Sequence, residues 1–561
     1  MLFNIRSKEA SMSTRNQQRI AIVGAGPAGL VAARWAIHYN LQPTLFDSAP
    51  TVGGVWRLES WGSNGETPSF RWPSNRTKLS RYCVKFHGMP HTVQTEIFPT
   101  REQMGIYLER YADHFGILPF TRLKHRVISV EPIDEDITFT SWRIHFINES
   151  NEKLCEQFDR LIIATGDCAK KYIPKAFQDL LTDKNCSFEG RVYHTPIDAP
   201  NELSAYSGKN VVIVGNSFSA LELLAFIAGN EDAESNAKHV TLLRRRPYWI
   251  VPKFVPINPS SNAPPGDQLD FQLPFDVLFM RRCIQQGKET IYQHEDEFLT
   301  FHHMLESLLP NHNLMAGGKF ALNPRHRSVC FTLVGEGFTK SVERIGERLD
   351  VFEKDPVVAL EKKSISLASG ASVPCDMLVF GTGFESSAHE ILSSRMLDAL
   401  EFHSGKYHQK LLLYKMTFHP QLHTIAFVGV NEGLLFMHME MQARWTAAVF
   451  SGRLPPPDPS DPQVQKYLSQ LRSERDFSND SRPTLMRGDF VAFADELAQE
   501  VGVMPDFARI QEEDPELYSL LWNAPVIGAH YFLEGPDADH EAAVSEIKTL
   551  PKEFHSFPLN K

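Results

Sequence analysis

The residues that could perform chemistry begin with a turn of spaced glycines near the N-terminus, at 24–29. The apolar, β-branched run 19–23 predicts a buried strand before this turn, and 30–36 predicts a helix after it. A glycine turn between a strand and a helix is typical of dinucleotide binding, because backbone N–H groups and the helix dipole hold the pyrophosphate. Five residues are expected to contact that cofactor: Gly24, Gly26, Pro27, Ala28 and Gly29.

A carboxylate follows the next predicted strand. Asp47 comes directly after the strand 44–46, about 20 residues beyond the turn, where a carboxylate can accept hydrogen bonds from ribose hydroxyls. The run 53–56 adds two glycines, which permit a close backbone approach, and a tryptophan that can pack on a flat ring. From this run Gly54, Val55 and Trp56 are expected to contact the cofactor; the alternative is a turn with a core tryptophan.

The same arrangement returns in the middle of the chain with the opposite charge. A strand over 210–214 leads into the turn 215–220, from which Gly215, Ser217, Ser219 and Ala220 are expected to contact a second cofactor. The next strand, 239–243, ends in arginines, and Arg244 and Arg245 are expected to bind there. Guanidinium groups favour a 2′-phosphate and a carboxylate favours a free ribose diol, so the first turn suits FAD and the second NADPH. An exposed basic strand end is the alternative.

The elements that must position these turns form two copies of one unit. Each copy runs from its glycine turn to an apolar strand that ends in Thr-Gly, so Thr165, Gly166 and Gly383 are also expected to line the cofactor sites. We therefore predict an α/β fold with two dinucleotide-binding, Rossmann-like domains, the NADPH domain inserted into the FAD domain. The expected segments are a disordered tail at 1–18, a first FAD part at 19–175, an NADPH domain with a helical insertion at 176–345, and a second FAD part with a C-terminal covering segment at 346–561.

Two local patterns add to this outline. The run 100–115 predicts a helix with Thr100 as its N-cap, and the apolar run 424–429 predicts a strand that returns to the first sheet.

Composition argues against nucleic-acid-binding, disulfide-bonded and membrane-spanning proteins. The 561 residues suggest two to four domains, and a net charge of −11 argues against nucleic-acid binding. The seven cysteines are widely spaced without a CxxC pair, which indicates free thiols in a reducing compartment, and no metal site is expected. No run of 18 apolar residues occurs, so we expect a soluble, cytoplasmic protein without membrane contact. A targeting leader within 1–18 is the alternative.

Taken together, these residues resemble a flavin-containing monooxygenase, a class B flavoprotein monooxygenase, over about 18–540. Besides the two turns, the matching blocks are Ser74-Asn75 with Lys78, Phe188-x-Gly190-x-x-x-His194, and Gln442-Ala443-Arg444-Trp445. The resemblance implies that NADPH reduces FAD and that O2 then gives a C4a-(hydro)peroxyflavin, which oxygenates nitrogen or sulfur of a small molecule (N,N-dimethylaniline monooxygenase activity). It also implies that Asn75 is a catalytic residue beside the flavin and that Gln442 either faces the flavin or packs its helix. A homodimer is expected from family habit.

Departures from the family pattern keep other functions open. Asp47 stands where the family has glutamate, and Asp198 stands where Baeyer–Villiger enzymes have tryptophan. A Baeyer–Villiger monooxygenase acting on ketones and an uncoupled NADPH oxidase remain alternatives, whereas a disulfide reductase lacks its cysteine pair. His194 is expected to hold the domain junction or to act in catalysis. The chain end, 553–561, lacks the apolar anchor of many animal members.

Overall fold

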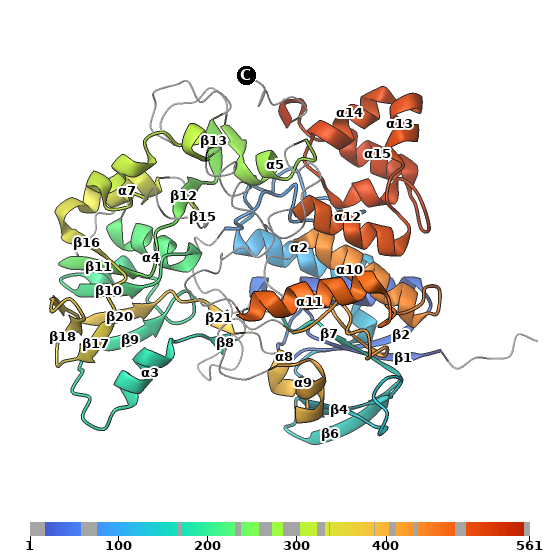
Figure 1. Cartoon of the computed structure of the whole chain (residues 1–561), viewed down its shortest axis with the longest axis horizontal. Helices are drawn as coiled ribbons and strands as arrows, with labels where there is room; N and C mark the ends of the chain where they lie inside the picture. The colour runs from blue at the N-terminus through green and yellow to red at the C-terminus, as the bar shows by residue number, and fades with distance from the viewer. Residues whose placement is uncertain are drawn as a thin grey trace, which may run out of the picture.

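Two parallel sheets, each with its own helices, form the two halves of the molecule (Figure 1). The computed structural model describes residues 17–57, 76–166, 168, 170–229, 237–256, 272–283, 303, 305–322, 331–335, 337–385, 388–402, 411–430, 435–476 and 490–554. Most of the tail predicted at 1–18 lies outside these residues.

The first sheet has the strand order β22-β7-β1-β2-β3, with every pair parallel. Its strands are β1 (Arg19–Val23), β2 (Gln42–Phe46), β3 (Thr121–Arg122), β7 (Arg160–Ile163) and β22 (Ile425–Phe427). Alternate residues of β1 pack on opposite faces: Ile20 and Ile22 join the core of the helices, and Ala21 and Val23 join a second core under a small sheet. Burial of both faces explains the continuous apolar run. The predicted return of the strand at 424–429 is confirmed by the β22–β7 pairing.

Helices cover one face of this sheet and an antiparallel sheet covers the other. The helices are α1 (Pro27–His38), α2 (Arg101–His114) and α10 (Phe436–Phe450), and the small sheet is β4 (Arg126–Pro132), β5 (Trp142–Ile147) and β6 (Lys153–Phe158). The predicted N-cap is confirmed, because the Thr100 side chain accepts from Gln103 N at 3.2 Å and Gln103 accepts from Thr100 N at 3.0 Å. This reciprocal capping box satisfies two orphan donors and fixes where α2 begins.

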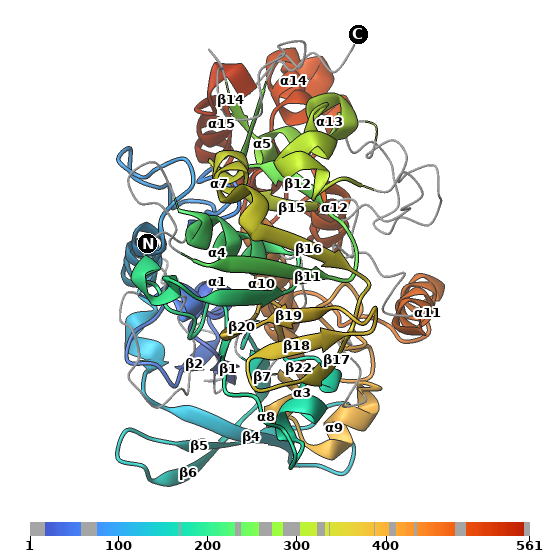
Figure 2. The same ribbon diagram turned by 90° about the vertical axis from the view of Figure 1, so that its left-hand side faces the viewer.

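The second sheet repeats this plan with the order β16-β11-β10-β20-β9, again all parallel (Figure 2). Its strands are β9 (Arg191–His194), β10 (Asn210–Val214), β11 (His239–Arg244), β16 (Leu349–Glu353) and β20 (Met377–Phe380). One face packs on α4 (Phe218–Ala228) and α7 (Phe338–Ile345); the other packs on α3 (Lys175–Thr182) and the sheet β17 (Val357–Leu360), β18 (Ser364–Leu367) and β19 (Ser372–Pro374). Four strands follow one order in both sheets, β7-β1-β2-β3 in the first and β20-β10-β11-β16 in the second. This order and the similar layers confirm the predicted α/β fold with two Rossmann-like units.

The predicted boundary at 345 is wrong. Strands β16 and β20 lie beyond it in sequence, yet they pair with β11 and β10 in the second sheet. The chain crosses between the halves at β8 (Lys170–Lys171) and β21 (Phe384–Glu385), which pair antiparallel with each other. The second unit is therefore inserted between 171 and 384, and the FAD part resumes about 40 residues later than expected, because a buried parallel strand carries no local sign of its sheet.

An excursion from the second unit packs against the first half. It comprises β12 (Trp249–Pro252), β13 (Phe254–Pro256), β14 (Gln272–Pro274), α5 (Phe275–Phe279), a described helical turn at 305–308, and β15 (Phe331–Val334). Most of its described apolar side chains belong to the same core as the C-terminal helices α12 (Phe490–Val501), α13 (Phe507–Glu513), α14 (Pro515–Asn523) and α15 (His540–Lys548), whereas Ile250, Met315, Phe320 and Val334 pack in the core of the second sheet. Short helices α8 (Ala388–Ile391) and α9 (Ser394–Ala399) and the outer helix α11 (Pro462–Asp476) complete the first half. Within the described part of the chain, no helix is both long and apolar enough to cross a bilayer.

Buried ionisable groups in the C-terminal segment make the fold sensitive to acid. Burial, together with the nearby Arg282 charge, lowers the pKa of His530 to about 3. Burial raises the pKa of Glu546, but the His87 hydrogen bond and the Lys85 charge outweigh it and lower that pKa to about 2. Both groups therefore bind more protons in the unfolded chain, so stability falls as the pH falls.

We expect the free energy of unfolding in urea to fall from pH 6.5 to 5, and His530 should contribute at most about 1.4 kcal/mol per pH unit to this slope. His91 and His194, whose pKa values burial also lowers, add to the slope, and Glu546 adds to it below pH 4.5. The variant His530→Asn keeps an acceptor for Ile527 N and removes this titration, so its slope above pH 5 should flatten. Exposed His114, changed to Gln, serves as the control. An unchanged slope in His530→Asn would contradict the assignment.

Candidate functional site

The first glycine turn brings three chain segments into close backbone contact. Gly24 has φ +109°, and a Cβ there would lie 2.4 Å from the carbonyl oxygen of Ala164 at the end of β7. A Cβ on Gly29 would lie 1.7 Å from Gly24 O, so no larger residue fits where α1 packs on the turn. Gly26 is the N-cap of α1 and Pro27 follows it. The first N–H groups of α1 consequently face the place where a pyrophosphate would lie.

The Gly-Gly-Val-Trp run lies directly on this turn. Gly53 N donates to Ala25 O at 2.8 Å, and a Cβ on Gly54 would lie 3.0 Å from Gly26 Cα. The short 3-10 helix Gly54–Trp56 follows and includes Val55. The structure thus brings together the predicted residues of both motifs, and the glycines serve contact between backbones as well as room for a cofactor.

Asp47 is held against the same turn. Its Oδ2 accepts from Ala25 N at 2.6 Å and its Oδ1 accepts from Ala49 N at 2.8 Å. Burial raises the pKa of Asp47, and the two backbone donors and the Arg57 charge act against that rise. A carboxylate has about four acceptor sites, so these bonds leave capacity for ribose hydroxyls.

Sequence reasoning missed Arg57, which is 1% exposed. Its Nη1 donates to Gly54 O at 3.1 Å, and its own carbonyl accepts from Arg101 Nη2 at 2.8 Å at the start of α2. A charged residue directly after the Gly-Gly-Val-Trp run was the available signal.

The second turn reproduces the first at the end of β10. Gly215 has φ +128°, and a Cβ there would lie 2.3 Å from Gly381 O. This is the same close approach that Gly24 makes to Ala164 O in the first turn. Ser217 is the N-cap of α4, with Ser219 and Ala220 in the first turn of the helix. Ala220 replaces the third glycine because its neighbour, Gly381, has no side chain: a Cβ on Gly381 would lie 2.6 Å from Ala220 Cβ.

The arginines after β11 differ in their surroundings. Arg244 is 8% exposed, and its Nη2 donates to Glu353 on neighbouring β16 at 3.1 Å. Its Nε and Nη1 are buried and have no hydrogen-bond partner among the described residues. Arg245 is exposed beside it. Two buried, unsatisfied guanidinium donors fit an anionic ligand, since leaving them unpaired is costly.

The Thr-Gly ends of the two central strands lie beside the turns. The Thr165 hydroxyl is buried without a hydrogen-bond partner among the described residues, which fits a polar ligand at the first turn, and Gly166 has φ +68°. Gly383 O accepts from Tyr172 N at 3.0 Å and from His194 Nε2 at 2.8 Å. Gly383 therefore joins the crossing strands to the second sheet.

His194 ends β9 at this crossing. It is 1% exposed, and burial lowers its pKa, so the neutral ring donates from Nε2 to the Gly383 carbonyl. Asp198 accepts from His194 N and pairs with Lys171 of β8. The contacts of His194 and Asp198 hold the domain junction, as one of the two expectations for His194 proposed.

Gln442 on α10 makes two hydrogen bonds at the carboxyl end of the first sheet. Its Oε1 accepts from Gly429 N and its Nε2 donates to Met416 O, both at 3.1 Å. Gly429 packs closely against α1, since a Cβ there would lie 2.6 Å from Ala28 Cβ. Met416 and its neighbour Lys415 both have positive φ, at +51° and +45°. Gln442 thus holds a strained turn and the Gly429 turn in place next to the first cofactor turn.

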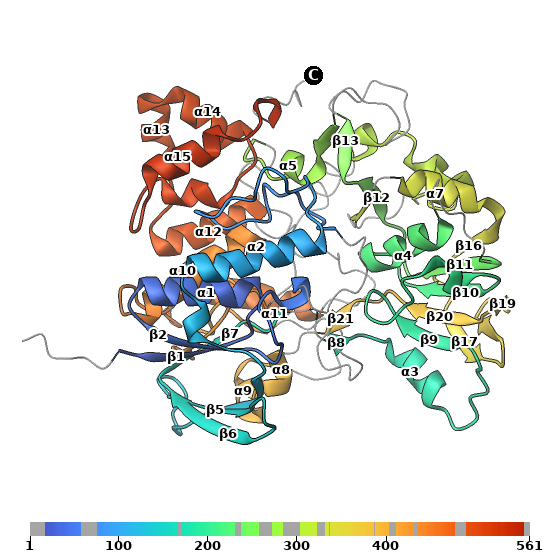
Figure 3. The same cartoon turned by 180° about the vertical axis from the view of Figure 1, so that it is seen from behind.

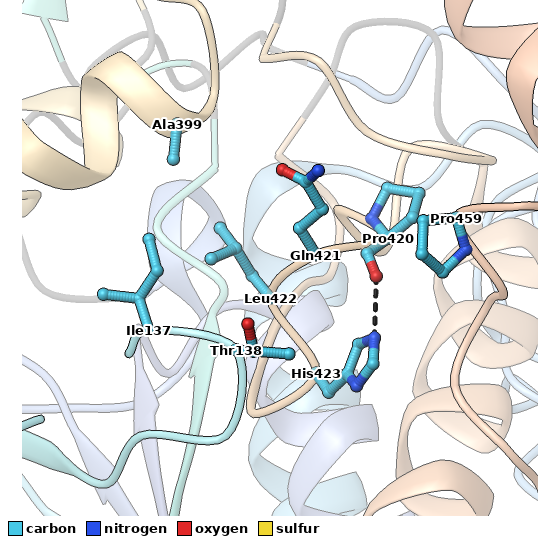
Figure 4. Close-up of a pocket in the computed structure, with 8 residues that line it drawn as sticks. All are labelled: Ile137, Thr138, Ala399, Pro420, Gln421, Leu422, His423 and Pro459. Carbon is cyan, nitrogen blue, oxygen red and sulfur yellow. Dashed lines mark hydrogen bonds between the residues drawn. The ribbon is translucent and has the colours of Figure 1, made fainter. Parts of the chain in front are cut away.

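Two further observations limit the site. Asn75, the predicted catalytic residue, lies outside the described residues. A cavity of about 280 Å³ lies at the amino ends of the first sheet, next to Leu422 and His423 before β22, so it faces away from the glycine turn (Figure 4). Its lining is mixed and includes Thr138, Gln421 and His423, but none of the lining residues is a carboxylate, a lysine or an arginine that would hold a dinucleotide. His423 is bonded to Pro420 O at 2.7 Å.

Two Rossmann units, one inserted into the other and each with its own glycine turn, define the class of flavoproteins that bind two dinucleotides. The model of the flavin-binding monooxygenase-like family matches residues 17–554, and the chain belongs to this family.

Individual relatives are distant but cover nearly the whole chain. A flavin-containing monooxygenase 5 of Cavia porcellus is 24% identical over 541 residues, covering 96% of this chain and 92% of that protein. A dimethylaniline monooxygenase (N-oxide-forming) 2 of Rattus norvegicus is 23% identical, covering 92% and 89%. The structure of an S-allyl-L-cysteine S-oxygenase from Allium sativum has a TM-score of 0.54 at 17% identity and covers 95% of this chain and 98% of its own. That structural likeness shows the shared fold.

The variant Gln442→Met should keep the side-chain volume while leaving Gly429 N and Met416 O unpaired. We expect a loss of about 2–4 kcal/mol in unfolding free energy and an earlier release of flavin on heating, followed by flavin fluorescence. Gln442→Glu places a carboxyl group in this fully buried site, where it can keep both contacts only when protonated, so its unfolding free energy should fall as the pH rises. A Met variant that releases flavin at the wild-type temperature would refute this role.

Proposed function

We propose that this protein is an FAD- and NADPH-dependent monooxygenase that inserts one oxygen atom of O2 into nitrogen or sulfur of a small molecule. The observation that carries the proposal is the pair of glycine turns, one beside Asp47 and one beside Arg244. The first offers a carboxylate to a free ribose diol, and the second offers unsatisfied guanidinium donors to a 2′-phosphate.

The residues of the chain bind and orient rather than transfer protons. The N-termini of α1 and α4 hold the two pyrophosphates, and the Thr165 hydroxyl and Asp47 are placed to hold FAD. When bound, FAD would supply the hydride-accepting and O2-activating chemistry, which no side chain supplies. The His194 ring donates from Nε2 to the Gly383 carbonyl and so holds the crossing in place, and burial lowers the pKa of this ring.

The substrate class rests on the relatives and on Asp198. One relative is named N-oxide-forming, and the Allium neighbour is named an S-oxygenase. Asp198 occupies the position of the Baeyer–Villiger tryptophan, and here it is bonded to His194 N and Lys171. The test is product analysis with an amine, a sulfide and a ketone, with NADPH oxidation and peroxide measured in parallel. An N- or S-oxide supports the proposal; an ester or lactone indicates the Baeyer–Villiger alternative, and peroxide equal to NADPH indicates the uncoupled oxidase.

We also propose a homodimer in a reducing, cytoplasmic location. The six cysteines in the described part of the chain are free thiols, which suits such a compartment. Light scattering after size-exclusion chromatography tests the dimer.

Asn75 is proposed as the catalytic amide beside the flavin. The variant Asn75→Leu should retain stoichiometric FAD and NADPH-dependent flavin reduction while losing oxygenated product by at least about a hundredfold, since an amide donor is removed without a change of charge. Flavin absorbance and product yield are the measurements. Product formation at the wild-type rate would remove Asn75 from the mechanism.

Arg244→Ala should lower the NADPH to NADH ratio of kcat/KM by about 10- to 100-fold, because a charge-assisted hydrogen bond contributes about 1.5–3 kcal/mol. Glu353→Gln is the matched control: it removes the ion pair but leaves the guanidinium, so the preference for NADPH should persist. A ratio that Arg244→Ala leaves unchanged would show that Arg245 or another group reads the phosphate.

A further inference from the structure

One ion pair joins the first half directly to the cofactor helix of the second. Lys78 Nζ, in the segment that follows Asn75, pairs with Glu222 of α4. Both side chains are about one quarter exposed. Figures 1 and 3 show α4 facing α2 of the first half across the seam between the halves.

Lys78 reaches the end of α4 that binds anions. Glu222 is in the second turn of this helix, and the Lys78 ammonium lies 5.7 Å from the ring centre of Phe218, the first residue of the helix. The positive dipole end and the free N–H groups of the first turn attract phosphate. By pairing with Glu222, Lys78 attaches this end of the helix to the other half.

The segment around Lys78 is fixed on both of its sides. Thr77 N donates to Pro99 O at 2.9 Å, which attaches the segment to the residues that precede α2. Ser80 donates to Asp276 Oδ2 of α5 from its N at 2.8 Å and from its Oγ at 2.7 Å, and both residues are buried. Lys78 therefore projects from an anchored backbone, so its pair with Glu222 sets where α4 lies relative to the first half.

We propose that Lys78 is a positioning residue for the second cofactor: its pair with Glu222 holds the two halves at the separation in which NADP is retained. The inference rests on the proposed function and adds that NADP retention depends on this contact between the halves. Weaker retention leaves the reduced flavin exposed to water, so a larger share of NADPH oxidation ends as peroxide.

The test uses the FAD-loaded protein with four variants: Lys78→Met, Glu222→Gln, the charge swap Lys78→Glu/Glu222→Lys, and Arg472→Met as control. Arg472 pairs with Glu401 wholly within the first half. We expect both single variants to weaken NADP+ binding about three- to fivefold, the size of a partly exposed ion pair, with FAD content and melting temperature unchanged. The swap should recover most of the affinity, and Arg472→Met should match wild type.

Other outcomes overturn the proposal. If Lys78→Met weakens NADP+ binding while Glu222→Gln strengthens it, Lys78 acts as a phosphate ligand and the pair positions nothing. If the losses of the two single variants add in the swap, the residues are not coupled.

The peroxide fraction and the NADP+ affinity separate this proposal from the proposed function. Peroxide per NADPH should rise in the single variants and fall again in the swap. Should wild type make no oxygenated product, the proposed function fails, but the NADP+ affinities of the variants still decide the role of the pair.

Discussion

The approach of a helix start to the end of a central strand is the constraint on which this structure depends. At Gly24 and Gly215 the chain passes beneath a carbonyl oxygen at a distance that no Cβ tolerates, and the following helix begins at once. This geometry leaves N–H groups unpaired at the same edge of each sheet. Because the approach is so close, only glycine fits at the first position of the turn, and both copies of the unit have it there.

Insertion of one unit into the other explains how the two sites come to face each other. Both passages of the chain occur at the β8–β21 pair, and His194, Gly383, Lys171 and Asp198 are bonded around it. Carboxyl ends of parallel strands are where ligands bind in such folds, and the crossing joins those ends. The charges at the two strand ends, a carboxylate in one half and guanidinium groups in the other, then distinguish two otherwise similar sites.

Local features were predictable from sequence and contacts distant in the chain were not. The glycine turns, the Thr100 cap and the return of β22 follow from short-range rules of backbone geometry, capping and apolar periodicity. The boundary at 345 failed because β16 and β20 find their partners only in space. The two hydrogen bonds of Gln442 and the burial of Arg57 likewise depend on segments that are far apart in the sequence. A local pattern of residue types does not predict such contacts.

The excursion 249–334 has a consequence for how such a protein could be recombined. Most of its described apolar residues share a core with the C-terminal helices, although its chain emerges from the second sheet and a few of its residues pack in the core of that sheet. If the second unit were exchanged with that of a relative by joining the chains only at β8 and β21, the excursion would be separated from the C-terminal helices with which it packs. A chimera that folds must therefore keep the excursion and the C-terminal helices from the same protein. The segment that can be exchanged is consequently shorter than the segment inserted between β8 and β21.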